Sequence, residues 1–144
     1  MKIGLAYSAH SKAFAKIHKG IRLLIVDGKI ALDYFLDVRK VVNRHLPTEG
    51  SLVSLDILLF LYWHYGKYPG TGCPLKLFFT SLPYSDMGIR YHLSRLANRK
   101  WLYLEINSAD KRSKDIFLTA KTIQKFHTIE AEIASLLKNV ATSK

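Results

Sequence analysis

The residues YSDMGIRYHLSRLANRKWLYLEINSADKRSKDIFLT, numbers 84–119, carry the strongest signals for the fold of this chain. It begins with signals for a helix start, because Pro83 disfavours helical backbone at the residue before it and Ser85 and Asp86 suit a helix N-terminus. Four side chains then follow at helical spacing, and we expect them to form the inward face of this helix: Ile89, Leu93, Leu96 and Lys100.

Two short apolar runs follow this helix, with a polar and basic turn between them. Residues 101–106 and 115–119 have the length and the aromatic or aliphatic character of β-strands. Residues 107–114 contain the Asn, Asp and Ser that favour turns, together with Lys111, Arg112 and Lys114. Helix, strand, basic hairpin and strand is the order of a winged helix-turn-helix. The sequence therefore predicts a mainly α protein with a small β-wing.

The flanking sequence predicts further helices around this unit. We expect helices at about residues 8–28, ended by Gly28, and at 29–45, then a nearly all-apolar helix from Ser51 or Ser54 to Gly66. A short positioning helix is predicted at 75–81, and a last helix from Thr119 or Thr122 to about residue 139. The prediction is one winged-helix domain over residues 1–144. Its DNA-binding lobe covers about 51–119, and its flanking dimerisation helices about 1–46 and 120–144.

Composition narrows the class of partner. The chain has 144 residues, 49% hydrophobic and 23% charged, and a formal net charge of +11. Such an excess of positive charge favours polyanions, nucleic acid first and anionic membrane second. The single cysteine, Cys73, excludes a disulfide within the chain and fits a reduced, cytoplasmic setting. We expect neither a membrane span nor a secretory signal, because the apolar runs are too short.

The outward face of the helix near residues 85–98 carries the side chains that we expect to contact DNA. A major groove admits one α-helix, and arginine there can pair bidentately with guanine. Between residues 84 and 125 there are nine lysines and arginines against four acidic residues. A basic hairpin tip can reach a minor groove or its phosphates. The predicted DNA-binding residues are Ser85, Met87, Arg90, Tyr91, Ser94 and Arg95 on the helix and Lys111, Arg112 and Lys114 on the wing.

Residues 88–102, GIRYHLSRLANRKWL, resemble the recognition helix and first wing strand of the multiple-antibiotic-resistance regulator (MarR) type of winged helix. DKRSK at 110–114, with FLT at 117–119, is similar to the wing of that family, although Lys100 stands where the family commonly has a glycine. The resemblance implies a dimeric bacterial transcriptional regulator that binds double-stranded DNA as a homodimer. It also allows a small-molecule effector of unknown identity, for which the aromatic candidates are Tyr34, Phe35, Tyr62, Trp63, Tyr65 and Phe79.

Other classes of function stay open. A winged helix can serve as a protein–protein adaptor, and a basic protein can bind any polyanion, such as an anionic membrane or the ribosome, without reading sequence. The basic hairpin and the first helix's lysines are, by themselves, also typical of solvated surface. An enzyme is not expected, because nucleophile motifs and glycine-rich phosphate loops are absent from the sequence. The six histidines do not pair at metal-ligand spacing, so neither a metal nor a cofactor is predicted.

Overall fold

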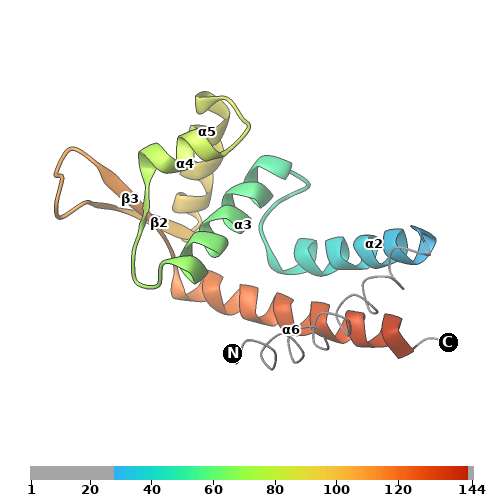
Figure 1. Cartoon of the computed structure of the whole chain (residues 1–144). Helices are drawn as coiled ribbons and strands as arrows, with labels where there is room; N and C mark the ends of the chain where they lie inside the picture. Colours follow the sequence, from blue (N-terminus) through green and yellow to red (C-terminus); the bar gives the residue numbers. More distant parts are fainter. Residues whose placement is uncertain (1–27, 143–144) are drawn as a thin grey trace, which may run out of the picture. The chain divides into compact units, whose positions relative to one another are not determined.

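The structure, a computed structural model, describes residues 28–142 of the chain (Figure 1). It divides into two compact units, one comprising residues 42–131 and the other, where described, residues 28–41 and 132–142. Its elements in chain order are α2 (Gly28–His45), α3 (Leu52–Lys67), β1 (Cys73–Pro74), α4 (Leu75–Ser81), α5 (Asp86–Asn98), β2 (Leu102–Ile106), β3 (Lys114–Leu118) and α6 (Ala120–Thr142).

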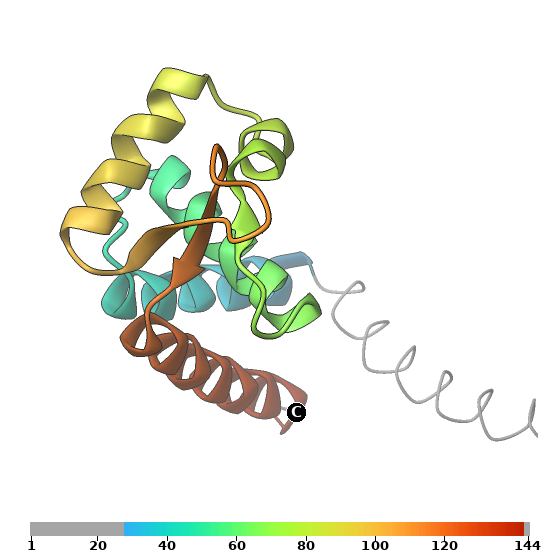
Figure 2. The same cartoon turned by 90° about the vertical axis from the view of Figure 1, so that its left-hand side faces the viewer.

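The unit formed by residues 42–131 has the architecture that the sequence predicts. Helices α3, α4 and α5 pack beside a small antiparallel sheet (Figure 2), and the β2–β3 hairpin extends away from them to the left in Figure 1. Helix α3 contacts both α5 and the sheet. Although its sequence is apolar nearly all round, it is fully buried on one face only, and Leu52, Leu59 and Trp63 are exposed on the opposite side. The core combines Ile57, Leu58 and Leu61 of α3 with Phe78, Ile89, Leu93, Leu96, Leu102 and Ile116.

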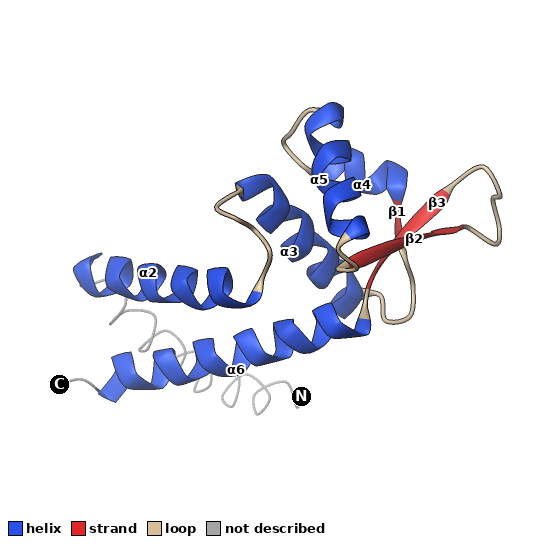
Figure 3. Ribbon diagram, turned by 180° about the vertical axis from the view of Figure 1, so that it is seen from behind, coloured by secondary structure: helices blue, strands red, loops and turns tan. Residues whose placement is uncertain are grey.

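The sheet has three strands in the order β1-β3-β2 (Figure 3). β2 and β3 pair from Leu102 opposite Leu118 to Ile106 opposite Lys114. The two-residue strand β1, which was not predicted from the sequence, pairs Cys73 with Ile116 at the edge of the sheet. A Cβ atom on the preceding Gly72 would lie 2.5 Å from the Phe117 ring, so only glycine allows the chain to enter β1 so close to β3.

Both ends of α5 are set by local sequence. Ser85 is the N-cap residue, and its Oγ accepts a hydrogen bond from the Gly88 N–H at 3.2 Å. At the other end Lys100 has φ +60°, and the Trp101 and Lys100 amides donate to the Leu96 and Ala97 carbonyls. This is the Schellman stop that glycine usually completes. The prediction that Lys100 continues the inward face was therefore wrong, because the helix has ended and its side chain is exposed.

The remaining helices largely follow their predicted ranges. Helix α4 covers residues 75–81 as predicted, and α6 begins at Ala120, directly after Thr119. Gly28, predicted at the end of an earlier helix, is the first residue of α2, and that earlier helix lies outside the described residues. Within residues 28–142, no helix is both long enough and apolar enough to cross a bilayer.

Candidate nucleic-acid interface

Helix α5 presents a continuous exposed face above its buried one. Ile89, Leu93 and Leu96 are buried, and on the other side Met87 is 82% and Tyr91 59% exposed. Arg90 and Ser94 are also exposed, whereas Arg95 is half-buried. A methionine and a tyrosine this exposed contribute little to the core, so this face is available to a partner.

Arg90 lies at the edge of a basic cleft between α4, the first turns of α5 and the wing. Its guanidinium carbon is 4.7 Å from the centre of the Phe79 ring, a cation–π arrangement that holds the side chain in place. The cleft has a volume of about 610 Å³. Its charged lining residues are four cations, Lys76, Arg90, Arg112 and Lys114, and one acid, Asp86. Low-dielectric walls lined by one sign of charge concentrate the field, so the cleft attracts anions.

The wing is ordered by side chains at its own turn. The Asn107 Oδ1 accepts hydrogen bonds from the Ala109 and Asp110 amides at 2.8 and 3.1 Å, and the Asp110 Oδ1 accepts one from the Arg112 amide at 3.0 Å. These Asx-type bonds hold the turn without using its cations. Lys111 and Arg112 are exposed at the tip, while Lys114 begins β3 beside the basic cleft.

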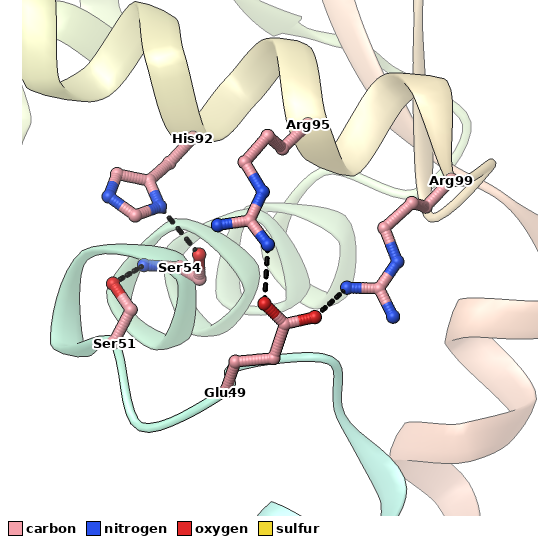
Figure 4. Close-up of polar contacts among 6 residues, drawn as sticks. All are labelled: Glu49, Ser51, Ser54, His92, Arg95 and Arg99. Carbon is pink, nitrogen blue, oxygen red and sulfur yellow. Dashed lines mark hydrogen bonds and ion pairs between the residues drawn. The ribbon is translucent and has the colours of Figure 1, made fainter.

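Arg95 has a different environment from Arg90. Its Nη2 donates to the Oε2 of Glu49, and the Nη1 of Arg99 donates to the Oε1 of the same carboxylate (Figure 4). The hydrogen bond from Arg95, followed in importance by the one from Arg99, lowers the pKa of Glu49. The same hydrogen bond between Arg95 and Glu49 raises the pKa of Arg95. The Arg95 guanidinium carbon also lies 5.7 Å from the centre of the Tyr91 ring. Arg95 thus lies next to the exposed face of α5, but its charge is already paired.

Two polar contacts attach α5 and the turn before it to α3. The His92 Nδ1 and the buried Ser54 Oγ are 2.9 Å apart, and burial, followed by the Arg95 charge, lowers the pKa of His92. In the turn before α5, the Tyr84 hydroxyl donates to the Asp56 Oδ2 at 2.5 Å, and this bond raises the pKa of Tyr84. His92 is half-buried and lies at the boundary of the core.

The aromatic residues proposed for an effector pocket lie in several places. Tyr62 stacks on Phe126 with ring centres 4.1 Å apart, and Trp63 is 53% exposed. Tyr65 lines a pocket of about 160 Å³ beside the sheet, and Phe79 lines the basic cleft. In the other unit, Tyr34 lines a separate hollow of about 310 Å³, and Phe35 is exposed.

Helix α5 and the wing, predicted as two separate groups of residues, meet at the basic cleft. Arg90, Arg112 and Lys114 line it, and Ser94 lines an adjoining hollow with Arg90 and Lys114. The places of Lys76 and Phe79 in the cleft, and of Glu49 beside Arg95, were not predicted from the sequence. Their spacing in the sequence carries no signal for these contacts. No group of three His, Cys, Asp or Glu side chains in residues 28–142 can hold a metal ion.

Solved structures share the fold of this chain, whereas comparisons with protein-family models and with curated proteins find no match. The chain is similar to a mutant of S. aureus MepR bound to an oligodeoxyribonucleotide, with a TM-score of 0.65 and 16% identity over 80% of this chain and 78% of that one. S. aureus MepR bound to ethidium bromide aligns with a TM-score of 0.53 and 20% identity over 72% and 74% of the two chains.

A third structure is a putative MarR-like transcription regulator from Bacillus cereus. It aligns with a TM-score of 0.52 and 13% identity over 92% of this chain and 85% of that one. At such identities the likeness establishes the fold, and it agrees with the element order, the sheet and the wing described above. The chain has the winged-helix fold of the MarR-type regulators.

Proposed function

We propose that this chain is a homodimeric transcriptional regulator that binds double-stranded DNA in a sequence-specific manner. Helix α5 would enter the major groove, and the wing would contact the flanking minor groove or backbone. The observation that carries this proposal is the basic cleft, because it brings cations of α4, α5 and the wing together on one side of the winged unit. Phosphates that flank a groove-bound helix match such an arrangement of positive charge.

Sequence reading is assigned to the exposed residues in the first half of α5. The Arg90 guanidinium has five donors and is held over the Phe79 ring, which restrains the side chain before it meets a guanine edge. Met87 offers an apolar surface to a thymine methyl group, and Tyr91 and Ser94 extend the same face. Ser85 already caps the helix, so its part in binding would be a phosphate contact near the helix N-terminus.

The wing supplies contacts that do not depend on base sequence. Lys111 and Arg112 are exposed at a turn that is already hydrogen-bonded, so little ordering is needed when they meet phosphates. Lys114 extends the positive surface toward α5. Together they would add affinity for any duplex and position α5 over its bases.

The homodimer is supported by apolar side chains that α2 leaves exposed, among them Leu32 at 65%, Phe35 at 56% and Leu36 at 54%. A second copy of the chain could bury them and set two half-sites about one turn of DNA apart. The complex of the MepR mutant with an oligodeoxyribonucleotide supports the choice of DNA as the partner. The complex of MepR with ethidium bromide supports retaining an effector in the proposal, with no ligand specified for this chain.

The test is selection of bound duplexes from a random pool at about 150 mM salt, where non-specific binding is weakened. An enriched and roughly palindromic motif is the expected result, because each copy of α5 would read one half-site. Binding without enrichment that fades as salt rises would contradict sequence reading and leave a general polyanion-binding protein. Absence of any duplex binding would instead direct attention to a protein partner.

A further inference from the structure

The loop between α2 and α3 places one carboxylate against Arg95 of α5 and Arg99, the residue that caps the end of this helix. Both oxygens of Glu49 are used, Oε2 by Arg95 and Oε1 by Arg99 (Figure 4). The three side chains are 52%, 42% and 46% exposed, respectively, so the cluster is open to solvent. It adjoins the face proposed to enter the major groove, because the Arg95 guanidinium is also close to Tyr91.

The loop is shaped so that it presents this carboxylate. Glu49 has φ +49° and Gly50 has φ +78°, so two successive residues adopt left-handed backbone. Glu49 has a Cβ atom, and such residues adopt this conformation less readily than glycine. Thr48 is buried and its Oγ1 donates to the Asn43 Oδ1 at 3.2 Å. The Ser51 amide donates to the Thr48 carbonyl at 2.7 Å, and the Ser51 side chain caps α3. Both sides of Glu49 are therefore held in place, and the loop conformation does not depend on the arginines alone.

The chemistry of the cluster matches that of a backbone contact in DNA. A carboxylate that accepts N–H donors on two oxygens presents the same acceptor pattern as two oxygens of a phosphate. Ion pairs that are this exposed contribute little to stability. The free-energy change for exchanging the Glu49 carboxylate for a DNA phosphate is therefore close to zero. While Glu49 is bound, it cancels one of the two positive charges of Arg95 and Arg99.

We propose that Glu49 acts as a built-in competitor for DNA phosphate, holding Arg95 and Arg99 in the free protein and so limiting the affinity for duplex DNA. The inference rests on the proposed DNA binding and adds to it a residue that tunes backbone affinity. It assigns different roles to the two arginines that the sequence predicted as readers. Arg90 is available before DNA arrives, whereas Arg95 becomes available when Glu49 is displaced.

Glu49→Gln tests this directly, because glutamine keeps the size of the side chain but removes the charge that competes with phosphate. Binding would be measured with a labelled pool of random-sequence duplexes over salt concentrations from about 50 to 200 mM. We expect about a three- to tenfold gain in affinity near the lower salt and a salt slope steeper by about one unit, since about one more phosphate is neutralised. Thermal unfolding of both proteins would show that the variant is folded.

Two further measurements separate this mechanism from a simple change in net charge. Glu105→Gln removes the same charge from β2, where Glu105 is exposed and has no ion pair among residues 28–142. It should give a clearly smaller gain. In a protein that carries Arg95→Ala and Arg99→Ala, Glu49→Gln should give no gain, because nothing remains for Glu49 to hold.

The outcomes distinguish this inference from the proposed function. If the wild-type chain binds duplexes and Glu49→Gln leaves affinity unchanged or weakens it, the competitor role is wrong and DNA binding stands. An equal gain from Glu105→Gln, or a gain that persists without the two arginines, would also overturn it. If neither the wild-type protein nor Glu49→Gln binds duplex DNA at the lowest salt, both the proposed function and the inference fail.

Discussion

The two halves of helix α5 carry similar residues in different environments. In the first half, Arg90 faces a cleft whose other cations come from α4 and the wing. In the second half, Arg95 shares the carboxylate of Glu49 with Arg99, the C-cap residue of the helix. The helix is continuous and both halves have the same buried side, so the difference comes from what lies opposite each half. An arginine on an outward face is therefore not by itself a free ligand for DNA.

The largest effect is expected from Arg90→Ala. Loss of a bidentate arginine–guanine contact typically costs about 1–3 kcal/mol of binding free energy at the matched site. The difference in affinity between duplexes that vary at that base pair should therefore become smaller. Affinity for the selected duplex and for a scrambled one would be measured in parallel. Arg95→Ala should weaken matched and scrambled duplexes by a similar and smaller factor, because Glu49 already offsets its charge and Arg95 would contact a phosphate. A larger loss from Arg95→Ala than from Arg90→Ala would reverse the comparison between the two halves.

Replacing Lys111 and Arg112 together by alanine tests whether the wing belongs with the first half of α5. All duplexes should bind more weakly and by a similar factor, since phosphate contacts carry no sequence information. The salt slope should fall by about two units, one for each lost phosphate contact. Titrations of matched and scrambled duplexes at several salt concentrations would measure both quantities. An unchanged slope would remove the wing tip from the interface.

Lys100→Gly examines the end of the second half, where the sequence departs from the glycine expected there. Lys100 has φ +60°, which costs a residue with a Cβ atom roughly 1 kcal/mol relative to glycine. We expect the free energy of unfolding in urea to rise by about that amount. Lys100→Ala removes the same charge but retains the Cβ atom, so it should give no comparable gain. Equal effects of the two variants would show that charge, and not backbone strain, matters at this position.

The smallest effect concerns the stability that the Glu49 cluster contributes by itself. Because its ion pairs are exposed, Glu49→Gln should change the urea midpoint only slightly at neutral pH. The folded-state pKa of Glu49 is lowered, so its contribution is present above the ordinary carboxyl value of 4.5 and is lost as pH falls through the lowered pKa. The free energies of unfolding of the wild-type protein and Glu49→Gln should therefore become equal at the acid end of this pH range. A difference that grows with acidity would contradict the assigned direction.

Much of the winged unit could be predicted because its signals are local. Ser85 caps α5, residues 75–81 form α4, and the turn after β2 uses the Asn and Asp side chains expected of it. Strand β1 escaped prediction because it has only two residues and exists through pairing with β3. The hydrogen bond from Tyr84 to Asp56 likewise joins residues 28 positions apart, and neither residue type indicates its partner.

The order of the elements, the inward face of α5 and the basic character of the wing can be read from the amino-acid sequence. These follow from apolar periodicity, caps and turn residues, which act over a few positions. Which arginine is paired with Glu49 and which is not depends on how the chain folds in space. Glu49 and Arg95 are 46 positions apart, and their contact depends on a left-handed loop held by Thr48 and Ser51. Electrostatic pairing of this kind depends on distance in space, and the one-dimensional pattern does not contain that distance.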